Sequence, residues 1–253
     1  MAANTPPMTS AKRVRPLELL YALYVGVIFL ALGLVALAGV LLLPGLARRR
    51  RSAQTMAALF LRAAGMRVSV RGLAQLPAAQ CVLVANHASY LDGIVLMACL
   101  PPRFGFVIKR EMARVPLAAT LLRRIGSQFV ERFDRTQVTI DARRVLRTAV
   151  NGHSLVFFPE GTFSTRPGLA KFHAGAFITA VRAGCAVVPA VIHGTRQALP
   201  PGRHLPRPVP ISVDLLPALL PGSGAGGSAP GELRERARAA ILAQLREPDL
   251  AAA

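Results

Sequence analysis

A histidine and an aspartate five positions apart form the pair in this sequence best suited to moving a proton. His87 and Asp92 lie in the stretch Asn-His-Ala-Ser-Tyr-Leu-Asp at residues 86–92. A carboxylate at this spacing can fold back onto one ring nitrogen, which fixes the tautomer and raises the basicity of the ring. The other nitrogen can then take a proton from a substrate hydroxyl, and no serine or cysteine nucleophile is needed. The alternative is an aspartate that caps a helix near an unrelated histidine.

The flanking residues predict where this pair lies. Residues 81–85, Cys-Val-Leu-Val-Ala, form a short apolar run that is rich in branched side chains and ends at a turn-forming residue, as buried strands do. Residues 93–100 are mostly apolar and predict a buried helix. We therefore expect His87 at the carboxyl end of a strand, where α/β sheets usually bind ligands, and Asp92 near the positive end of a helix.

The remaining segments alternate between strand-like and helix-like patterns. Strands are predicted at residues 67–71, 81–85, 104–109, 127–130, 154–158, 186–192 and 211–215, and helices at residues 116–124, 136–150, 172–183 and 232–246. This alternation predicts an α/β fold: a single domain with a largely parallel mixed sheet flanked by helices. A length of 253 residues suits one substantial core.

The N-terminal part predicts a membrane anchor. Between residues 17 and 43 the only charged residue is Glu18. A helix of this length measures about 40 Å, more than the ~30 Å hydrocarbon core of a bilayer. The run is too long for the core of a signal peptide, and four arginines at residues 48–51, typical of a membrane interface, follow it. We therefore predict an N-terminal membrane-anchoring helix that is not removed.

The charges around this anchor leave its course open. Lys12, Arg13 and Arg15 before the apolar run nearly balance the four arginines after it, so the positive-inside rule barely favours an orientation. Either the anchor is one tilted span, or it bends near Gly33 and returns to the same face. Residues 52–64 predict a short amphipathic helix, capped by its first residue, on the membrane or against the domain.

The C-terminal residues predict a linker and a last helix. Residues 221–230 are rich in Gly and Ser, and residues 232–246 form a basic amphipathic pattern. This helix is expected either to pack on the edge of the domain or to lie on a membrane surface. The predicted organisation is therefore an anchor with an amphipathic helix at residues 1–66, the α/β domain at residues 67–220, and a flexible linker with the C-terminal helix at residues 221–253.

Charge and composition favour lipid as a partner. The formal net charge is +19, from 31 basic and 12 acidic residues, and 53% of the residues are hydrophobic. A basic surface attracts anionic lipid or nucleic acid. No zinc spacing, helix-turn-helix pattern or aromatic-and-basic sheet motif accompanies the charge, so nucleic acid is not an expected partner. Cys81, Cys99 and Cys185 suit neither a disulfide framework nor a metal site and predict small buried side chains in a reducing compartment.

Three further blocks of sequence accompany the histidine and aspartate. Residues 126–132 read Gly-Ser-Gln-Phe-Val-Glu-Arg, residues 158–162 read Phe-Pro-Glu-Gly-Thr, and residues 188–190 read Val-Pro-Ala. With residues 86–92 they make four blocks in the order found in the glycerophospholipid acyltransferase family, which the chain resembles over residues 80–195. Members of that family include 1-acylglycerol-3-phosphate acyltransferases. The family usually has an arginine directly after Glu-Gly-Thr, whereas Phe163 takes that place here.

The resemblance implies a membrane-bound O-acyltransferase. Such an enzyme would move a fatty acyl group from acyl-CoA or acyl carrier protein to the free hydroxyl of a lysophospholipid, above all 1-acylglycerol-3-phosphate, to give phosphatidic acid. His87 would take the hydroxyl proton and Asp92 would steady the imidazolium, with no covalent enzyme intermediate. No cofactor or metal is implied. The expected location is a membrane, at the cytoplasmic face of a bacterial inner membrane, and the oligomeric state is left open.

The resemblance also implies a site for the acceptor phosphate. It offers Arg132 for this contact, and Lys109 lies in a matching context. Arginine and lysine present charge-assisted donors to anionic oxygens. The alternatives are a surface ion pair of Arg132 with Glu131 or Asp134, and a Lys109 that is merely solvated.

The Glu-Gly-Thr block supplies the rest of the predicted acceptor site. Glu160 is expected to orient the acceptor or to brace its loop, and Thr162 completes the block. Gly161 lets the backbone turn sharply and expose amides that could hold the developing oxyanion. Because Phe163 carries no charge, Arg166 is the nearest cation that could replace the family arginine. The alternative is a more apolar pocket that takes a lysolipid without a terminal phosphate.

Two other classes of protein fit the sequence less well. A lipid or thioester hydrolase would need a nucleophile elbow or a metal cluster, and neither Gly-x-Ser-x-Gly nor His-Glu-x-x-His occurs. A membrane-anchored basic binding protein would have little use for two polar blocks at strand ends.

Overall fold

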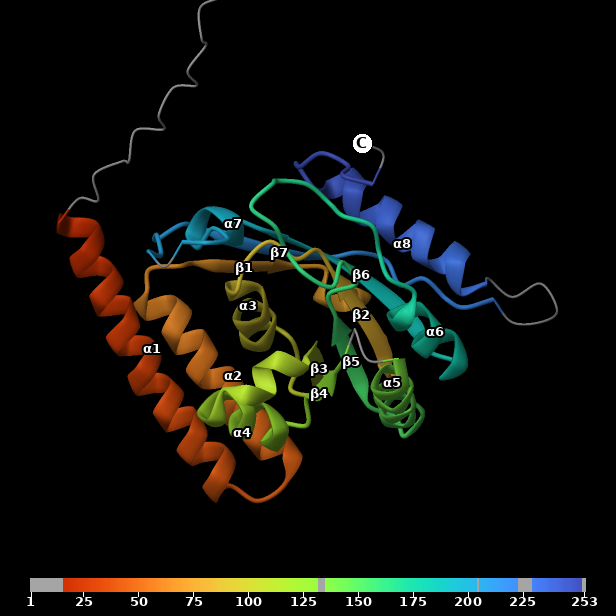
Figure 1. Cartoon of the computed structure of the whole chain (residues 1–253), viewed down its shortest axis with the longest axis horizontal. Helices are drawn as coiled ribbons and strands as arrows, with labels where there is room; N and C mark the ends of the chain where they lie inside the picture. Colours follow the sequence, from red (N-terminus) through yellow and green to blue (C-terminus); the bar gives the residue numbers. More distant parts are fainter. Residues whose placement is uncertain (1–15, 132–134, 204, 223–228, 252–253) are drawn as a thin grey trace, which may run out of the picture.

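The computed structural model of the chain describes residues 16–131, 135–203, 205–222 and 229–251 (Figure 1). Its α-helices are α1 (Pro16–Leu42), α2 (Leu46–Ala63), α3 (Leu91–Cys99), α4 (Pro116–Arg124), α5 (Arg135–Val150), α6 (Gly175–Arg182), α7 (Thr195–Ala198) and α8 (Pro230–Gln244). Its strands are β1 (Val68–Arg71), β2 (Cys81–Ala85), β3 (Phe104–Lys109), β4 (Gln128–Val130), β5 (Ser154–Phe157), β6 (Ala186–His193) and β7 (Ile211–Leu215). Short 3-10 helices lie at Leu73–Gln75 (η1) and Arg110–Arg114 (η2).

The strands form one seven-stranded sheet in the order β1-β7-β6-β2-β5-β3-β4. Neighbouring strands are parallel except β6 and β7, which are antiparallel. The prediction of a single α/β domain with a largely parallel mixed sheet is therefore confirmed. β2, the strand that precedes His87, lies in the middle of the sheet, and all of its residues are buried.

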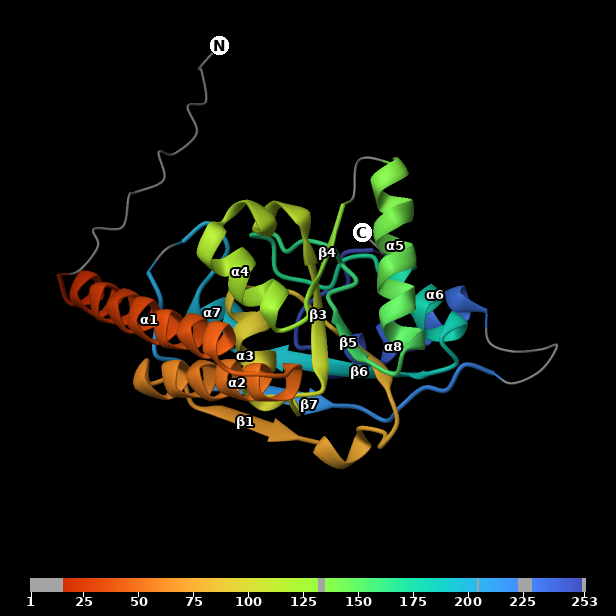
Figure 2. The ribbon, with the colours of Figure 1, turned by 90° about the horizontal axis from the view of Figure 1, so that it is seen from below.

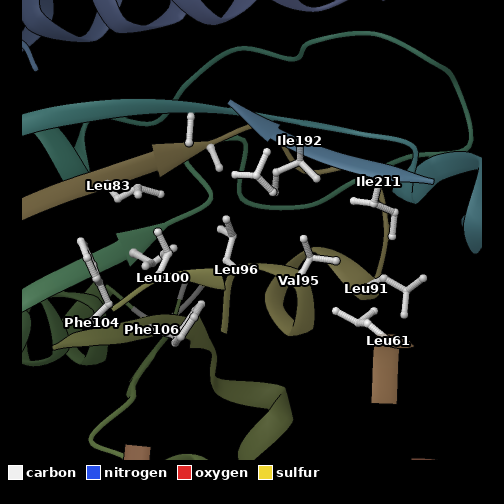
Figure 3. Close-up of a cluster of buried hydrophobic side chains, with 14 of the residues drawn as sticks. Leu61, Leu83, Leu91, Val95, Leu96, Leu100, Phe104, Phe106, Ile192 and Ile211 are labelled. Atoms are coloured by element: carbon white, nitrogen blue, oxygen red, sulfur yellow. The ribbon is translucent and has the colours of Figure 1, made fainter. Parts of the chain in front are cut away.

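Helices cover both faces of the sheet, and β2 contributes to both cores. Leu83 packs in the layer that contains α2 and α3, whereas Val84 packs in the layer that contains α6 and α8. Figure 2 shows α1 to α4 on one side of the sheet and α5, α6 and α8 on the other. In the first layer, Val95 and Leu96 of α3 lie next to strand residues such as Leu83 and Ile192 (Figure 3).

The N-terminal segment is a hairpin of two packed helices. α1 continues through Gly33, so of the two alternatives left open the bend at that residue is wrong. The chain turns instead after α1 ends and returns along it as α2. The Tyr21 hydroxyl donates to the carbonyl of Ala64 at 2.6 Å, which ties the start of α1 to the end of α2. The helices approach closely at Gly39, where an added Cβ would meet the Ser52 side chain.

α2 begins at Leu46, so Ser52 is an interior residue and not the predicted cap. Arg50, one of the four predicted interface arginines, is 7% exposed. Its guanidinium donates to the carbonyls of Ile125 at 2.8 Å and Arg103 at 2.7 Å, and burial lowers its pKa. Arg50 therefore fastens α2 to the domain and does not mark a membrane interface.

α1 is the one described helix that is long and apolar enough to cross a membrane. One side of it packs on α2 and α4, where Val40 is fully buried. Arg124 of α4 donates to the carbonyls of Val40 at 3.1 Å and Leu41 at 3.0 Å, which satisfies backbone groups that a helix end leaves unpaired. The helix also exposes large apolar side chains at Leu17, Leu19, Leu20, Leu23, Tyr24, Val27, Phe29, Leu30, Leu34, Val35, Leu41 and Leu42.

The C-terminal helix packs on the domain, which is one of its two predicted positions. Leu233, Ala237 and Ile241 of α8 are fully buried in the cluster that contains α6 and β6. Most of the predicted linker, residues 223–228, lies outside the described residues. α6 begins at Gly175 and not at Phe172, because residues before it belong to the loop after β5: the amide of His173 donates to the carbonyl of Pro159 at 2.8 Å.

Candidate active site

The continuations of β2 and β5, which are adjacent and parallel, leave the sheet on opposite faces. β2 leads to α3 in the layer of α2, and β5 leads to α6 in the layer of α8. Where neighbouring connections diverge in this way, α/β proteins bind ligands outside the carboxyl ends of the strands, a position called the crevice below. Residues 86–92 and 158–163 directly follow these two strands, so both blocks lie at this position.

The His87 ring contacts the Asp92 carboxylate, as the spacing predicts. Nδ1 of His87 lies 2.8 Å from Oδ2 of Asp92. The His87 side chain is 15% exposed, and its Nε2 makes no hydrogen bond to any residue that the structure describes. If Nδ1 carries the proton donated to Asp92, Nε2 keeps its lone pair. The arrangement therefore leaves one basic nitrogen at the crevice.

Asp92 is fixed by a local turn. Its side chain has no exposed area, and Oδ2 also accepts the amides of Ala88 at 2.7 Å and Ser89 at 2.8 Å. Its Oδ1 is buried without a partner among the described residues. An unpartnered buried oxygen costs about 1–3 kcal/mol, which hydrogen bonds to a charged group, at about 1.5–3 kcal/mol each, outweigh. Asp92 thus both caps the turn before α3 and holds His87.

The Glu160 carboxylate joins the two segments of the crevice. Oε1 accepts the amide of His87 at 2.7 Å, and Oε2 accepts the amide of Ala170 at 2.8 Å. Glu160 is 7% exposed, so both of its oxygens are engaged within the protein. Sequence reasoning left two roles open for Glu160, and these contacts are those of a residue that braces the loop.

Burial raises the pKa of Glu160 to about 7, and the nearby charge of Asp92 adds to the rise. The two amide hydrogen bonds and the Arg196 guanidinium act in the opposite sense but do not cancel the effect of burial. The carboxyl therefore changes protonation state close to neutral pH. Only its ionised form offers both oxygens as full acceptors, so the two contacts can be held together only while the carboxyl is ionised.

Aromatic rings surround His87. Its ring stacks on Phe158 with centroids 4.2 Å apart and meets Phe163 edge-on at 4.4 Å. Tyr90, which is 64% exposed, meets Phe163 edge-on at 4.8 Å. The side chain that takes the place of the family arginine therefore packs against the histidine and gives this part of the crevice an apolar edge.

The predicted acceptor-binding residues are only partly brought together. Lys109, at the end of β3, donates from Nζ to the hydroxyl of Thr162 at 3.1 Å. Arg166 is exposed, and its side chain makes no hydrogen bond or ion pair within the described part of the chain. Its carbonyl accepts the Ser164 hydroxyl at 3.1 Å. Arg132 lies outside the described residues.

Gly161 forms the predicted sharp turn, but its own amide is engaged within the turn. Its φ of +79° lies in the left-handed region that favours glycine. Its amide donates to the carbonyl of Phe158 at 3.0 Å. The prediction that this turn exposes amides for an oxyanion is therefore wrong for Gly161 itself.

Two residues at the crevice were missed by sequence reasoning. The Asn86 amide group donates to the carbonyl of Ile192 at 3.0 Å and accepts its amide at 2.8 Å, which joins the end of β2 to β6. Arg196 of α7 donates to the carbonyl of Ser164 at 2.8 Å. An asparagine directly after a strand is a recognisable signal, since its side chain often replaces backbone partners. No pattern in the sequence marks Arg196.

The sequence of this chain is similar to those of known acyltransferases. The sequence pattern of the family described as Acyltransferase matches residues 67–193. A 1-acyl-sn-glycerol-3-phosphate acyltransferase of Pseudomonas aeruginosa is 31% identical over 191 residues, which cover 73% of this chain and 71% of that protein. A lyso-ornithine lipid O-acyltransferase of the same species is 33% identical over 137 residues, which cover 54% of this chain and 52% of that protein. The chain spans about two fifths of the length of the first chloroplast relatives that it matches.

A solved structure shares the fold. The crystal structure of PlsC, the 1-acyl-sn-glycerophosphate acyltransferase of Thermotoga maritima, superimposes with a TM-score of 0.73 at 23% sequence identity, and the alignment covers 90% of this chain and 93% of that one. At this identity the likeness establishes the architecture alone.

Proposed function

This chain belongs to the acyltransferase family, and from this premise we propose that it moves an acyl group from a thioester to the free hydroxyl of a lysophospholipid. The observation that carries the proposal is the 2.8 Å contact between Nδ1 of His87 and Asp92, which leaves Nε2 without a hydrogen bond to any described residue at the crevice between β2 and β5. A ring held in this way is suited to general base catalysis on a hydroxyl.

The reaction then needs no covalent enzyme intermediate. Nε2 of His87 takes the proton of the acceptor hydroxyl while that oxygen bonds to the carbonyl carbon of the thioester. Asp92 stabilises the imidazolium that results. When the tetrahedral intermediate collapses, its carbon–sulfur bond breaks and the departing thiolate takes the proton from the imidazolium. The products are an ester and a free thiol, and His87 is neutral again.

The test of the proposal is the release of free thiol from acyl-CoA or acyl carrier protein, measured with and without a lysophospholipid. Acyl transfer predicts thiol release that depends on the acceptor and appears together with a diacyl product. A hydrolase would release thiol without the acceptor, and a binding protein would release none in either case.

For the acceptor we infer 1-acylglycerol-3-phosphate. Lys109 lies beside Thr162 at the end of β3, and the chain carries a net charge of +19, both of which suit a phosphate monoester. Against this, Phe163 meets His87 edge-on where the family has its arginine. A lost charge-assisted contact of about 1.5–3 kcal/mol weakens phosphate binding by roughly ten- to a hundredfold unless another cation replaces it. Arg166, exposed on the same loop, is the candidate replacement.

The second candidate acceptor is a lysolipid without a terminal phosphate, which the apolar edge formed by Phe163 and Tyr90 favours. The relative named as a lyso-ornithine lipid O-acyltransferase supports the same reading. Acceptors with and without a terminal phosphate should be compared in wild type and in Arg166→Ala. Loss of the phosphate preference in the variant supports replacement by Arg166, whereas equal activity on both acceptors in both proteins supports the second candidate.

We also propose that the protein works at a membrane surface, at the cytoplasmic face of a bacterial inner membrane. The apolar side chains that α1 exposes would enter the lipid, and α2 would return the chain to the same face. Attachment through apolar burial is insensitive to charge screening. Carbonate or high-salt washing should therefore leave the full-length chain in the membrane fraction, and release by salt would exclude this mode of attachment.

A further inference from the structure

The C-terminal segment, residues 245–251, lies against the loop that follows the Glu-Gly-Thr block. Leu169 in that loop forms a short parallel bridge with it. The amide of Leu169 donates to the carbonyl of Pro248 at 2.9 Å, and its carbonyl accepts the amide of Leu250 at 3.0 Å. Leu169 itself is fully buried. A segment distant in sequence thus holds the backbone of this loop on both sides of one residue.

One carboxylate of the C-terminal segment holds the loop at two further points. Oε2 of Glu247 accepts the amide of Gly168 at 2.7 Å. The same carboxylate pairs with Arg196 through bonds of 2.8 and 3.1 Å, and Arg196 donates in turn to the carbonyl of Ser164 at 2.8 Å. The Glu247 and Arg196 side chains are 19% and 13% exposed, so water screens this pair less than it would a surface pair.

A second ion pair holds the other side of the bridge. Arg238 of α8 donates to the carbonyls of Leu169 at 2.9 Å and Ala170 at 3.1 Å, and it pairs with Asp249 at 2.9 Å. Its hydrogen bond to Asp249 raises the pKa of Arg238, so it stays charged. The carbonyls of the loop therefore have fixed donors on the C-terminal helix.

The loop and the segment fit each other closely at Gly168. This glycine has a φ of +138°, and a side chain there would place its Cβ 2.7 Å from the carbonyl oxygen of Pro248 and against the Leu250 side chain. Only glycine suits both the backbone conformation and the approach. The contact is thus a specific one and not a loose covering of the loop.

The loop that is held in this way ends at the active site. The next amide after Leu169, that of Ala170, donates to Oε2 of Glu160 at 2.8 Å, and Oε1 of Glu160 accepts the amide of His87 at 2.7 Å. The order of contacts is therefore C-terminal segment, loop, Glu160 and His87. Each step is a hydrogen bond with an atom that is buried or half-buried.

We propose that the C-terminal segment is a positioning device for the active site: by holding residues 168–170 it keeps the Ala170 amide on Glu160, and through Glu160 it fixes the backbone of His87. The inference rests on the proposed acyl transfer. Glu247 is a positioning residue, because its hydrogen bonds go to Gly168 and Arg196 and it acts on His87 only through the loop. Its removal affects catalysis through the geometry and the charge of Glu160.

This coupling has a signature in the dependence of activity on pH. The groups that face Glu160 are Asp92 and His87 on one side and Arg196 and Arg238 on the other. The Ala170 amide favours the ionised carboxylate and so opposes the rise in the pKa of Glu160 caused by burial. The acidic limb of the pH–rate profile then contains the protonation of Glu160 as well as that of the general base, so loosening residue 170 moves its midpoint upward. A purely structural loss lowers the profile without moving that midpoint.

The experiment compares Glu247→Ala with Glu247→Gln, whose amide oxygen can still accept the Gly168 amide. Arg234→Ala is the matched control on the same C-terminal part, because Arg234 pairs only with Glu235 in α8 among the described residues. For Glu247→Ala we expect kcat to fall about tenfold with KM within about twofold, and the acidic limb to move upward. Glu247→Gln should keep kcat within about threefold of wild type, and Arg234→Ala should match wild type.

Hydrogen–deuterium exchange of the full chain supplies a readout that does not depend on activity. In Glu247→Ala, exchange should rise in peptides that contain residues 86–92 and 160–170, and it should not rise in peptides from α5. If wild type shows no acyl transfer, the proposed function fails while the exchange data still test the coupling. If wild type is active and Glu247→Ala matches Arg234→Ala in kcat, pH profile and exchange, the inference is overturned. A fall in kcat with an unmoved acidic limb and no recovery in Glu247→Gln overturns it as well.

Discussion

The two carboxylates of the crevice are held in opposite ways. Asp92 takes its three hydrogen bonds from residues at most five positions away, all within one turn. Glu160 takes its two from amides 73 and 10 positions away, and the second of these is held in turn by the C-terminal segment. A local turn keeps its geometry while distant parts of the molecule change. A carboxylate that is held by several elements changes its position when any of these elements moves.

The difference also separates the chemical roles that we propose. Asp92 acts on the His87 ring, and Glu160 acts on the His87 backbone. Loss of the Asp92 contact should remove proton transfer itself, whereas loss of the Glu160 contact should shift the position of the His87 ring. The following experiments test that separation.

The largest effect is expected at His87, which both carboxylates contact. His87→Ala should lower acyl transfer by about 10²- to 10⁴-fold, because it removes the general base. Thiol release in the presence of lysophospholipid measures the loss. The thermal unfolding midpoint and membrane attachment should stay as in wild type, and near-normal turnover in this variant would end the proposed mechanism.

The raised pKa of Glu160 predicts that the free energy of unfolding falls as pH rises. Its pKa in the folded protein is about 7, above the ordinary value of 4.5, so the folded state binds the proton more tightly. The resulting stabilisation is fully present below about pH 4.5 and is lost as pH rises to about 7, by roughly 3 kcal/mol in total. The free energy of unfolding, measured from pH 5 to pH 8 in wild type and in Glu160→Gln, checks this. The fall in the free energy of unfolding should be smaller in the variant by about this amount, and equal slopes would contradict the burial argument.

Substituting each carboxylate by its amide compares the two attachments directly. Asp92→Asn should lower kcat by about a hundredfold, because it removes the charge that stabilises the imidazolium. Glu160→Gln should lower kcat by only about tenfold, because one amide donor keeps an oxygen partner while the other faces an NH₂ group. Exchange of residues 160–170 should rise in Glu160→Gln and stay unchanged in Asp92→Asn. A larger loss in Glu160→Gln would reverse the proposed roles.

The smallest effect is expected at a contact that belongs to neither carboxylate. Lys109→Ala should raise KM for 1-acylglycerol-3-phosphate by about threefold and leave kcat within about twofold, because an exposed lysine contributes little to binding. Lysolipid acceptors without a terminal phosphate should show no change in KM. A fall in kcat with an unchanged KM would assign Lys109 to positioning the Thr162 loop instead.

What could be predicted from the sequence follows the same division. The His87–Asp92 contact follows from spacing, and the α/β sheet follows from alternating patterns, because both depend on residues close together in the chain. The contact between Glu160 and the His87 amide depends on β2 and β5 becoming neighbours, and no local pattern specifies which amide a carboxylate will meet. Arg50 was misread for a similar reason: four arginines after an apolar run suggest an interface, but its partners are carbonyls of residues 103 and 125.

The position of β1 has a consequence for how the protein is made. Within the described sheet β1 lies at the edge and pairs with β7 alone, and Val68 is opposite Ile211, 143 residues later in the chain. At a synthesis rate of about 5–20 residues per second, β1 leaves the ribosome roughly 7–30 s before its partner exists. During that interval its backbone donors and acceptors are unpaired on both edges. The newborn chain therefore exposes both edges of this strand until residues 211–215 have been synthesised.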